Sequence, residues 1–323
     1  MPDSLTPLPI VLGPTGAGKS DLALCIAEAL PGEIVNYDSL QIYRGFDIGT
    51  AKTPVSARRG IPHHLIDIRD PTELFTAGDY SVLARRTLAE IAARGHTPVL
   101  VGGTGFYLRS LLEGLFSGPS RSSELRKRLE LREERRRGSL HRILTRLDPL
   151  SAARIHPSDK NKLIRALEVR LLEGQPVSEL LNRGRDPLAG FRPIKIGLNP
   201  PRELLYQRLD ARSVQLFAQG LIEEVGELLH RGIPPDAKPF ESIGYQQGLA
   251  VMQNRMTRAD ALASTQLETR RYAKRQLTWF RKESGVHWLP AFGNDSQTIA
   301  QTLAIITAET VMERLQPHSK NSK

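Results

Sequence analysis

Eight residues near the start of the chain constrain its fold more than any other stretch. Residues 13–20 read Gly-Pro-Thr-Gly-Ala-Gly-Lys-Ser and match the phosphate-loop pattern G-x-x-x-x-G-K-[ST] at every fixed position. The apolar run 8–12 before them is typical of a strand, and the pattern 19–30 is typical of a helix. This order of strand, loop and helix predicts an α/β protein that binds phosphate groups at the start of the helix.

The residue types of this loop suit phosphate for separate physical reasons. Glycines let successive backbone N–H groups turn around an anion, and the helix N-terminus adds a favourable dipole. Lys19 supplies a positive charge, and the Ser20 hydroxyl can bind Mg²⁺. We expect the whole loop to hold phosphate, with Ser20 as the metal ligand; its residues are Gly13, Pro14, Thr15, Gly16, Ala17, Gly18, Lys19 and Ser20.

The next segments alternate between strand and helix. Residues 33–37 indicate a second strand that ends beside Asp38, residues 79–94 a helix, and residues 98–101 a third strand. Because parallel strands end at one edge of a sheet, we expect Asp38 to lie beside the phosphate loop. There it would serve as a metal partner or a general base, although Asp-Ser is also suitable for capping a helix.

The third strand is followed by glycines and a threonine, Gly102-Gly103-Thr104-Gly105. Many ATPases place a magnesium-binding aspartate at the end of such a strand. The glycines predict either a backbone that approaches a ligand closely or a simple turn into a helix. Earlier in the chain, His63 and His64 are adjacent, so on an extended segment they point in opposite directions. We expect structural or substrate-contacting hydrogen bonds from them, not a metal site.

A basic helical segment interrupts the α/β pattern. Residues 121–146 contain ten arginines and lysines against four glutamates, and residues 160–172 show helical apolar spacing. A turn-rich stretch follows, and residues 194–198 return to a strand pattern. We therefore predict a P-loop NTPase-like parallel sheet core with flanking helices and an inserted small all-helical domain. The predicted ranges are 1–114 and 192–316 for the core, 115–191 for the insertion and 317–323 for a disordered tail.

Two later helical patterns carry cations. On the pattern 202–220, Arg208 and Arg212 lie four residues apart, a spacing that suits diphosphate oxygens or an exposed ion-paired face. On the pattern 269–281, basic residues alternate with aromatic ones. Such a stripe can bind RNA phosphates and stack on bases.

Composition narrows the classes of partner and compartment. The chain of 323 residues has a formal charge of +10, which favours a polyanionic partner. Its single cysteine, Cys25, excludes an intrachain disulfide and is typical of the reducing cytoplasm. No run of about 18 apolar residues occurs, so we expect no membrane partner.

Several of these stretches together resemble the tRNA dimethylallyltransferases, which prenylate an adenine next to the anticodon. The resemblance extends over most of the chain and rests on eight motifs in family order. They are GPTGAGKS (13–20), DSLQIY (38–43), DIGTAK (47–52), HHLIDI (63–68), GGTGFY (102–107), HPSDKNKLIRALEV (156–169), SIGYQQ (242–247) and TRRYAKRQLTWFR (269–281). Two positions depart from the family pattern: Ser158, where asparagine is expected, and Lys162, where arginine is expected.

The resemblance implies transfer of a dimethylallyl group from dimethylallyl diphosphate to N6 of adenine 37, with Mg²⁺ as cofactor. It implies that Asp38 is the general base, with Thr104 at the substrate channel, and that Arg212 and, more weakly, Arg208 bind diphosphate. The implied tRNA-binding residues are Asp38, Ser39, Leu40, Gln41, Thr104, Arg126, Asn161, Lys162, Leu163, Ile164, Arg165, Ser242, Ile243, Gly244, Tyr245, Gln246, Lys274, Arg275, Gln276, Trp279 and Arg281. We expect a monomer, because tRNA alone could occupy a large basic surface.

Two other functions use the same phosphate loop. A small-metabolite or nucleotide kinase would bind ATP there, but the absence of an aspartate directly after Val101 and the basic helix argue against it. A non-catalytic RNA-binding nucleotide switch would explain the charge and the loop. It would leave Asp38 and the glycine-threonine turn without a role.

Overall fold

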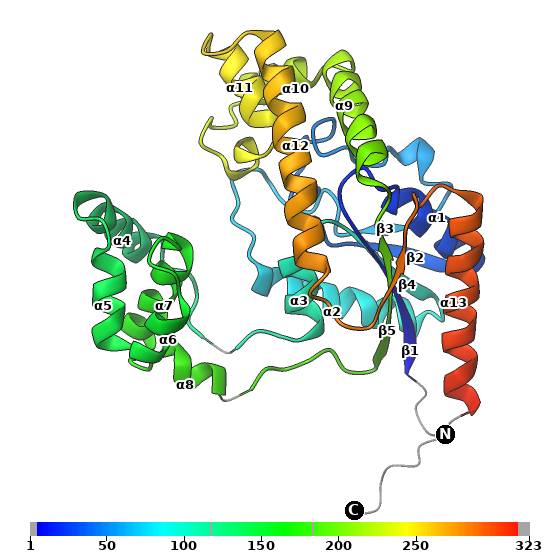
Figure 1. Ribbon diagram of the computed structural model, residues 1–323, viewed down its shortest axis with the longest axis horizontal. Helices are drawn as coiled ribbons and strands as arrows, with labels where there is room; N and C mark the ends of the chain where they lie inside the picture. The colour runs from blue at the N-terminus through cyan, green and yellow to red at the C-terminus, as the bar shows by residue number, and fades with distance from the viewer. Residues whose placement is uncertain (1–4, 117, 183, 316–323) are drawn as a thin grey trace, which may run out of the picture. The chain divides into compact units, whose positions relative to one another are not determined.

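The computed structural model describes residues 5–116, 118–182 and 184–315, so the tail predicted at 317–323 lies outside the described residues. The chain divides into two compact units. Met1–Leu111 and Leu188–Lys323 form what we call the sheet unit, and Leu112–Pro187 forms the helical unit. The helical unit is therefore inserted between two segments of the sheet unit (Figure 1).

The sheet unit contains all the strands of the described residues. These are β1 Thr6–Leu12, β2 Gly32–Asn36, β3 His63–His64, β4 Thr97–Val101, β5 Phe191–Leu198 and β6 Val286–Leu289. Its helices are α1 Lys19–Ala29, η1 Val55–Ala57, α2 Ala77–Ala93, α3 Gly105–Leu112, α9 Arg202–Ala218, α10 Leu221–His230, η2 Lys238–Glu241, α11 Tyr245–Met252, α12 Arg258–Phe280 and α13 Ser296–Leu315. The last residue of α3 belongs to the helical unit.

The six strands form one parallel sheet in the order β3-β2-β4-β1-β5-β6. This confirms the predicted fold class, a parallel α/β core with a phosphate loop after its first strand. The central strand β1 pairs with β4 on one side and β5 on the other, and the phosphate loop follows directly from its carboxyl end. The loop therefore lies in the middle of the sheet edge where parallel α/β proteins bind ligands.

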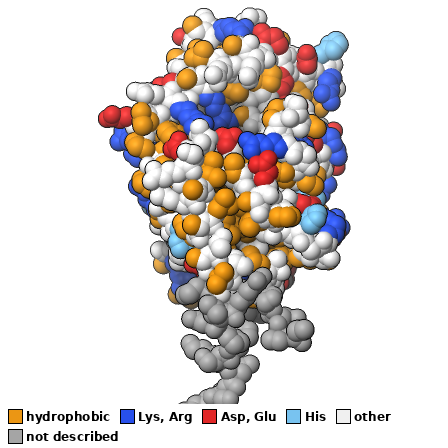
Figure 2. All heavy atoms as spheres, turned by 90° about the vertical axis from the view of Figure 1, so that its right-hand side faces the viewer, with side chains coloured by type: hydrophobic (Ala, Val, Ile, Leu, Met, Phe, Trp, Pro, Cys, Tyr) orange, Lys and Arg blue, Asp and Glu red, His pale blue; other side chains and the backbone are white. Residues whose placement is uncertain are grey.

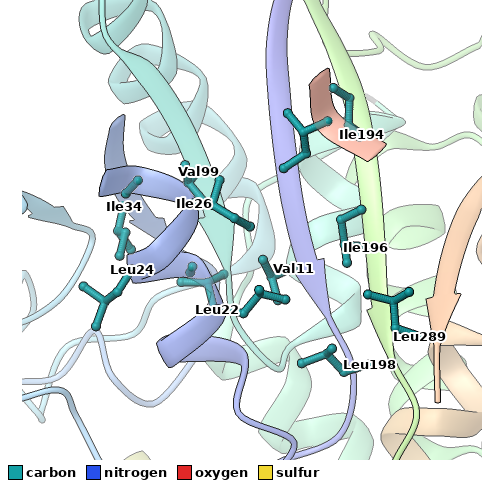
Figure 3. Packing of buried hydrophobic residues seen from close by; sticks show 14 of the residues in the cluster. Val11, Leu22, Leu24, Ile26, Ile34, Val99, Ile194, Ile196, Leu198 and Leu289 are labelled. Carbon is teal, nitrogen blue, oxygen red and sulfur yellow. The ribbon is translucent and has the colours of Figure 1, made fainter. Parts of the chain in front are cut away.

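Helices cover both faces of this sheet. The helices α1 and α13 pack on one face, and α2 and α3 lie on the other (Figure 1). Figure 3 shows the apolar cluster under α1, where Leu22 and Ile26 meet Val11 and Val99 from the central strands. These side chains are removed from water, which is the main favourable term for folding and gives the phosphate loop a rigid base.

A second apolar cluster joins the later helices to the segment after β2. It packs Ile42 and Phe46 against Phe217, Val225 and Tyr245. The ring of Phe46 lies 4.7 Å from that of Tyr245, centroid to centroid. This cluster anchors the polar segment 47–54, which forms part of the candidate site.

The helical unit has its own core. It consists of α4 Ser123–Arg135, α5 Ser139–Leu147, α6 Pro149–Arg154, α7 Lys160–Glu173 and α8 Val177–Asn182. Leu129, Leu144, Leu163 and Leu167 are buried together at its centre. Buried Asp148 accepts hydrogen bonds from the N–H and hydroxyl groups of Ser151 and Ser178, and these bonds hold the pKa of its carboxyl below the ordinary value despite burial.

The paired histidines form the short edge strand β3, and their predicted hydrogen bonds are confirmed. His63 Nδ1 lies 2.8 Å from the Ile61 carbonyl oxygen, and His64 Nε2 lies 2.5 Å from the Glu33 carboxylate. On the face that carries α13, acidic, basic and apolar side chains are interspersed (Figure 2). Among the described helices, none is long and apolar enough to cross a membrane.

Candidate active site

The phosphate loop depends on glycine at places where the chain approaches it closely. Gly13 has φ +143°, and a Cβ there would lie 2.7 Å from the Leu198 carbonyl oxygen. Gly18 has φ +83°, and its Cβ would lie 2.9 Å from the backbone nitrogen of Gly293. The loop is thus held from two sides, by the end of β5 and by a turn before α13 that the sequence analysis did not single out.

Lys19 lies inside the loop at the start of α1. Its ammonium donates a hydrogen bond of 2.8 Å to the Pro14 carbonyl. Burial lowers the pKa of Lys19 to about 8; nearby Asp38 acts in the opposite direction, and Arg212 lowers it further. A buried cation of this kind gains stability from an anionic ligand.

A cavity of about 380 Å³, which we call the loop cavity, opens beside the phosphate loop. Its walls combine the loop with segment 50–54, with Asp38 and Gly103 at the strand ends, and with side chains of α9 and α12. Arg208, Arg212, Tyr272 and Gln276 are the contributions of those two helices. The structure therefore brings together the phosphate loop, Asp38 and the two arginines, as the sequence predicts.

A second cavity of about 470 Å³ adjoins the first and is rich in aromatic residues, so we call it the aromatic cavity. Tyr43, Phe75 and Tyr107 line it, together with Ser242 and Ile243 from the turn before α11. The residues that line both cavities are Thr15, Asp38, Thr50, Arg212 and Tyr272. Asp38 thus stands at the boundary between a cationic cavity and an aromatic one.

Local hydrogen bonds orient the Asp38 carboxylate. Its backbone N–H donates to Asn36 Oδ1 at 3.1 Å, and its Oδ1 accepts from the Leu40 N–H at 2.9 Å. Thr104 contacts the residue after Asp38: its hydroxyl accepts a hydrogen bond from the Ser39 N–H and donates one to Ser39 Oγ. Thr104 is absent from the walls of both cavities, so its contacts indicate a positioning role.

The two arginines of α9 differ in their partners. Arg208 donates to Asn294 Oδ1 at 2.8 Å, and its guanidinium lies 4.8 Å from the centre of the Phe292 ring. Burial lowers the pKa of Arg212, and the neighbouring Arg208 lowers it further. Two cations that face one cavity repel each other until an anion binds between them.

The helix α12 also carries a basic hollow, which shares Arg275 with the aromatic cavity. This hollow has a volume of about 240 Å³ and is lined by Lys274, Arg275, Thr278, Trp279 and Lys282. The stripe predicted from residues 269–281 is therefore a concave basic surface with an aromatic wall.

Comparison with known proteins identifies the family. The family model described as IPP transferase matches residues 41–283. The tRNA dimethylallyltransferase of Solibacter usitatus is 60% identical over 288 residues, 89% of this chain and 94% of that protein. That of Koribacter versatilis is 50% identical over 298 residues, 92% of this chain and 97% of that protein. The chain belongs to the IPP transferase family.

Solved structures of similar proteins agree with this assignment. The full-length tRNA isopentenylpyrophosphate transferase of Bacillus halodurans aligns with a TM-score of 0.70 and 36% identity, covering 96% of this IPP transferase and 97% of that chain. A eukaryotic dimethylallyltransferase acting on tRNA aligns with a TM-score of 0.80 and 27% identity, covering 98% and 81%.

Some expected tRNA contacts of this IPP transferase lie on its surface. Asn161 and Lys162 are exposed at the start of α7, and Lys162 is paired with Asp159 at 2.6 Å. Gln246, Lys274, Arg275 and Arg281 are exposed in the sheet unit. Ser39, Leu40, Ser242 and Ile243 line the aromatic cavity, and Gln41 lines the loop cavity.

At other positions where tRNA contacts are expected, the residues are buried. Leu163 and Ile164 belong to the core of the helical unit, with 0% and 1% of their surface exposed. Gly244 is buried at the start of α11, and Tyr245 is fully buried. The Tyr245 hydroxyl donates to Glu224 and accepts from the Gly49 N–H, so it anchors the segment 47–54.

Arg126 and Arg165 are held by an acidic partner inside the helical unit. The fully buried Glu168 accepts from Arg126 at 2.8 Å through both carboxylate oxygens, and from Arg165 at 2.8 Å. Their guanidinium groups thus have a structural role that the motif does not reveal. Gln276 is also buried, and Trp279 packs so closely that a Cβ on Gly105 would lie 2.1 Å from its indole ring.

Proposed function

We propose that this protein transfers the dimethylallyl group of dimethylallyl diphosphate to N6 of adenine 37, next to the anticodon of tRNA, and releases diphosphate. Membership of the family and the names of its relatives support this activity. The observation that carries the proposal is the position of Asp38, which stands between the cationic loop cavity and the aromatic cavity. This reaction needs a general base between the diphosphate-binding site and the adenine-binding site, because the adenine amine attacks the carbon that leaves the diphosphate.

The loop cavity supplies the electrostatics for the leaving group. As the C1–O bond of dimethylallyl diphosphate breaks, negative charge develops on the diphosphate. Lys19, Arg212 and the N–H groups of the first turn of α1 stabilise that charge, and Arg208 adds a further cation. These groups stand in place before the reaction, so they need little reorganisation.

Asp38 handles the proton. The N6 nitrogen of adenine forms a bond to C1 of the dimethylallyl group, and the proton that N6 loses passes to the Asp38 carboxylate. The bond to Leu40 N–H fixes Oδ1, which leaves Oδ2 for the amine. Because N6 lies within the stacked anticodon loop, the base has to turn out of the stack to reach the aromatic cavity.

Mg²⁺ fits the residues at the loop. The Ser20 hydroxyl lines the loop cavity near Asp21 and Asp38, and these oxygen donors suit a hard cation that keeps several waters and binds diphosphate oxygens. Ser20 would hold the ion, which would neutralise charge on the diphosphate. We assign tRNA phosphates to the basic hollow of α12 and to Asn161 and Lys162, and we infer a cytoplasmic monomer.

A transfer assay tests this function. The purified protein with Mg²⁺, labelled dimethylallyl diphosphate and an anticodon stem-loop with unpaired adenines should transfer label to the RNA. Asp38→Asn should abolish transfer while diphosphate binding persists. Asp236→Asn is the control, because Asp236 is an exposed carboxylate outside both cavities and should be dispensable for transfer. Transfer of phosphate from ATP without prenyl transfer would contradict the proposal.

A further inference from the structure

Gln276 joins two loops of the candidate site. Its Oε1 accepts a hydrogen bond from the Thr15 N–H at 2.8 Å, and its Nε2 donates to the Gly103 carbonyl at 2.9 Å. Only 5% of its surface is exposed. A buried amide with both ends satisfied is held rigidly, so Gln276 fixes the phosphate loop against the end of β4.

The same amide accounts for a glycine after β4. A Cβ on Gly103 would lie 2.6 Å from Gln276 Nε2 and 3.2 Å from Asp38 Oδ2. The sequence predicts either a close approach to a ligand or a simple turn at this glycine, and the structure shows a close approach by two side chains of the protein itself. Gln276 and Asp38 are neighbours on the same wall of the loop cavity.

Thr15 lies on the side of the phosphate loop where the group to be transferred has to sit. Thr15 and Asp38 line both cavities, so this side faces the general base. In a phosphoryl-transfer enzyme the terminal phosphate occupies the place between loop and base, and it needs N–H donors. Here the Thr15 N–H is already bonded to a carbonyl oxygen, which repels the oxygens of a phosphate.

We propose that Gln276 is a specificity-determining residue. It makes this side of the phosphate loop bind an uncharged hydrocarbon group in preference to a third phosphate. A dimethylallyl group accepts no hydrogen bonds. It therefore loses no interaction when the Thr15 N–H donates to the Gln276 amide instead. A triphosphate would have to displace the amide and leave Gly103 and Gln276 without their partners, which is costly in a buried place. The inference rests on the proposed function, because it takes the dimethylallyl group as the group transferred.

Calorimetry with inorganic diphosphate and inorganic triphosphate, in Mg²⁺ and without RNA, tests the inference. The wild-type protein should bind diphosphate more tightly. Gln276→Ala frees the Thr15 N–H, so the ratio of triphosphate Kd to diphosphate Kd should fall about tenfold. Gln276→Glu places a negative charge at the same point, so the ratio should rise. Opposite shifts in two variants of one residue separate selectivity from a general loss of structure.

Gln266→Met is the matched control, because Gln266 lies on the same helix and donates to the Asp210 carbonyl at 3.3 Å, outside both cavities. In the Gln266→Met variant, the ratio of triphosphate Kd to diphosphate Kd should equal that of the wild type. An unchanged ratio in both Gln276 variants, or a shift in the same direction, would overturn the inference. Because no RNA or prenyl donor is used, failure of prenyl transfer would contradict the proposed function without altering this ratio.

Discussion

The buried glutamate of the helical unit yields a quantitative prediction. Glu168 has no exposed surface, and hydrogen bonds from Arg126 and Arg165 outweigh its burial and lower its pKa from 4.5 to about 2. At about 1.4 kcal/mol for each pKa unit, this difference corresponds to about 3 kcal/mol of stability at neutral pH. Breaking a buried ion pair by removing one partner costs a similar amount, about 3–5 kcal/mol.

The expected change is therefore large and local. Glu168→Gln keeps the volume but leaves two arginines without their counter-charge. Hydrogen exchange of the full chain at neutral pH should show protection in α4 and α7 reduced by about a hundredfold. Because the folded pKa is lowered, the difference between wild type and variant should be complete above pH 4.5 and vanish as the pH falls toward about 2.

Glu134→Gln is the control for this experiment. The Glu134 side chain is 63% exposed, and its carboxylate lies 3.5 Å from the Lys160 ammonium. A surface pair of this kind contributes less than about 1 kcal/mol. If the two variants lose equal protection, or if the effect of Glu168→Gln does not depend on pH, the assignment of Glu168 as the electrostatic centre of the unit is wrong.

Three further predictions concern the sheet unit. The affinity for inorganic diphosphate should fall as the pH rises through about 8, where Lys19 loses its proton, and Lys19→Arg should remove this component in calorimetry. Tyr245→Phe should destabilise the protein by about 1–3 kcal/mol in urea unfolding, because Glu224 and the Gly49 N–H lose a partner, while RNA affinity in filter binding stays unchanged. Arg275→Ala should weaken RNA binding and reduce its salt dependence without altering the diphosphate Kd. A loss of diphosphate affinity would contradict the assignment of the basic hollow to RNA.

The chemistry of the site follows largely from local sequence. A phosphate loop is a continuous stretch whose backbone conformation and charges are specified by its own residues, so it can be identified without the rest of the fold. Asp38 could be placed beside it because strands of a parallel sheet end at one edge. The cations of α9 and α12 follow from helical spacing, which puts residues four apart on one side of a helix.

Which faces are buried was decided only by tertiary packing. Three motifs resemble RNA-contacting segments, yet side chains in each of them pack inward. These side chains are Leu163 and Ile164 in the first motif, Tyr245 in the second and Gln276 in the third. Helical spacing gives the relative direction of side chains but not which direction faces water, because that depends on segments distant in the sequence. Gln276 bonds to Thr15, which lies 261 positions earlier in the sequence. Strand β3 has only two residues, too few to show the alternation of apolar and polar residues typical of a strand. The sequence by itself thus determined the phosphate loop and the carboxylate beside it. The tertiary structure decided which side chains enclose them, because enclosure depends on contacts between distant segments.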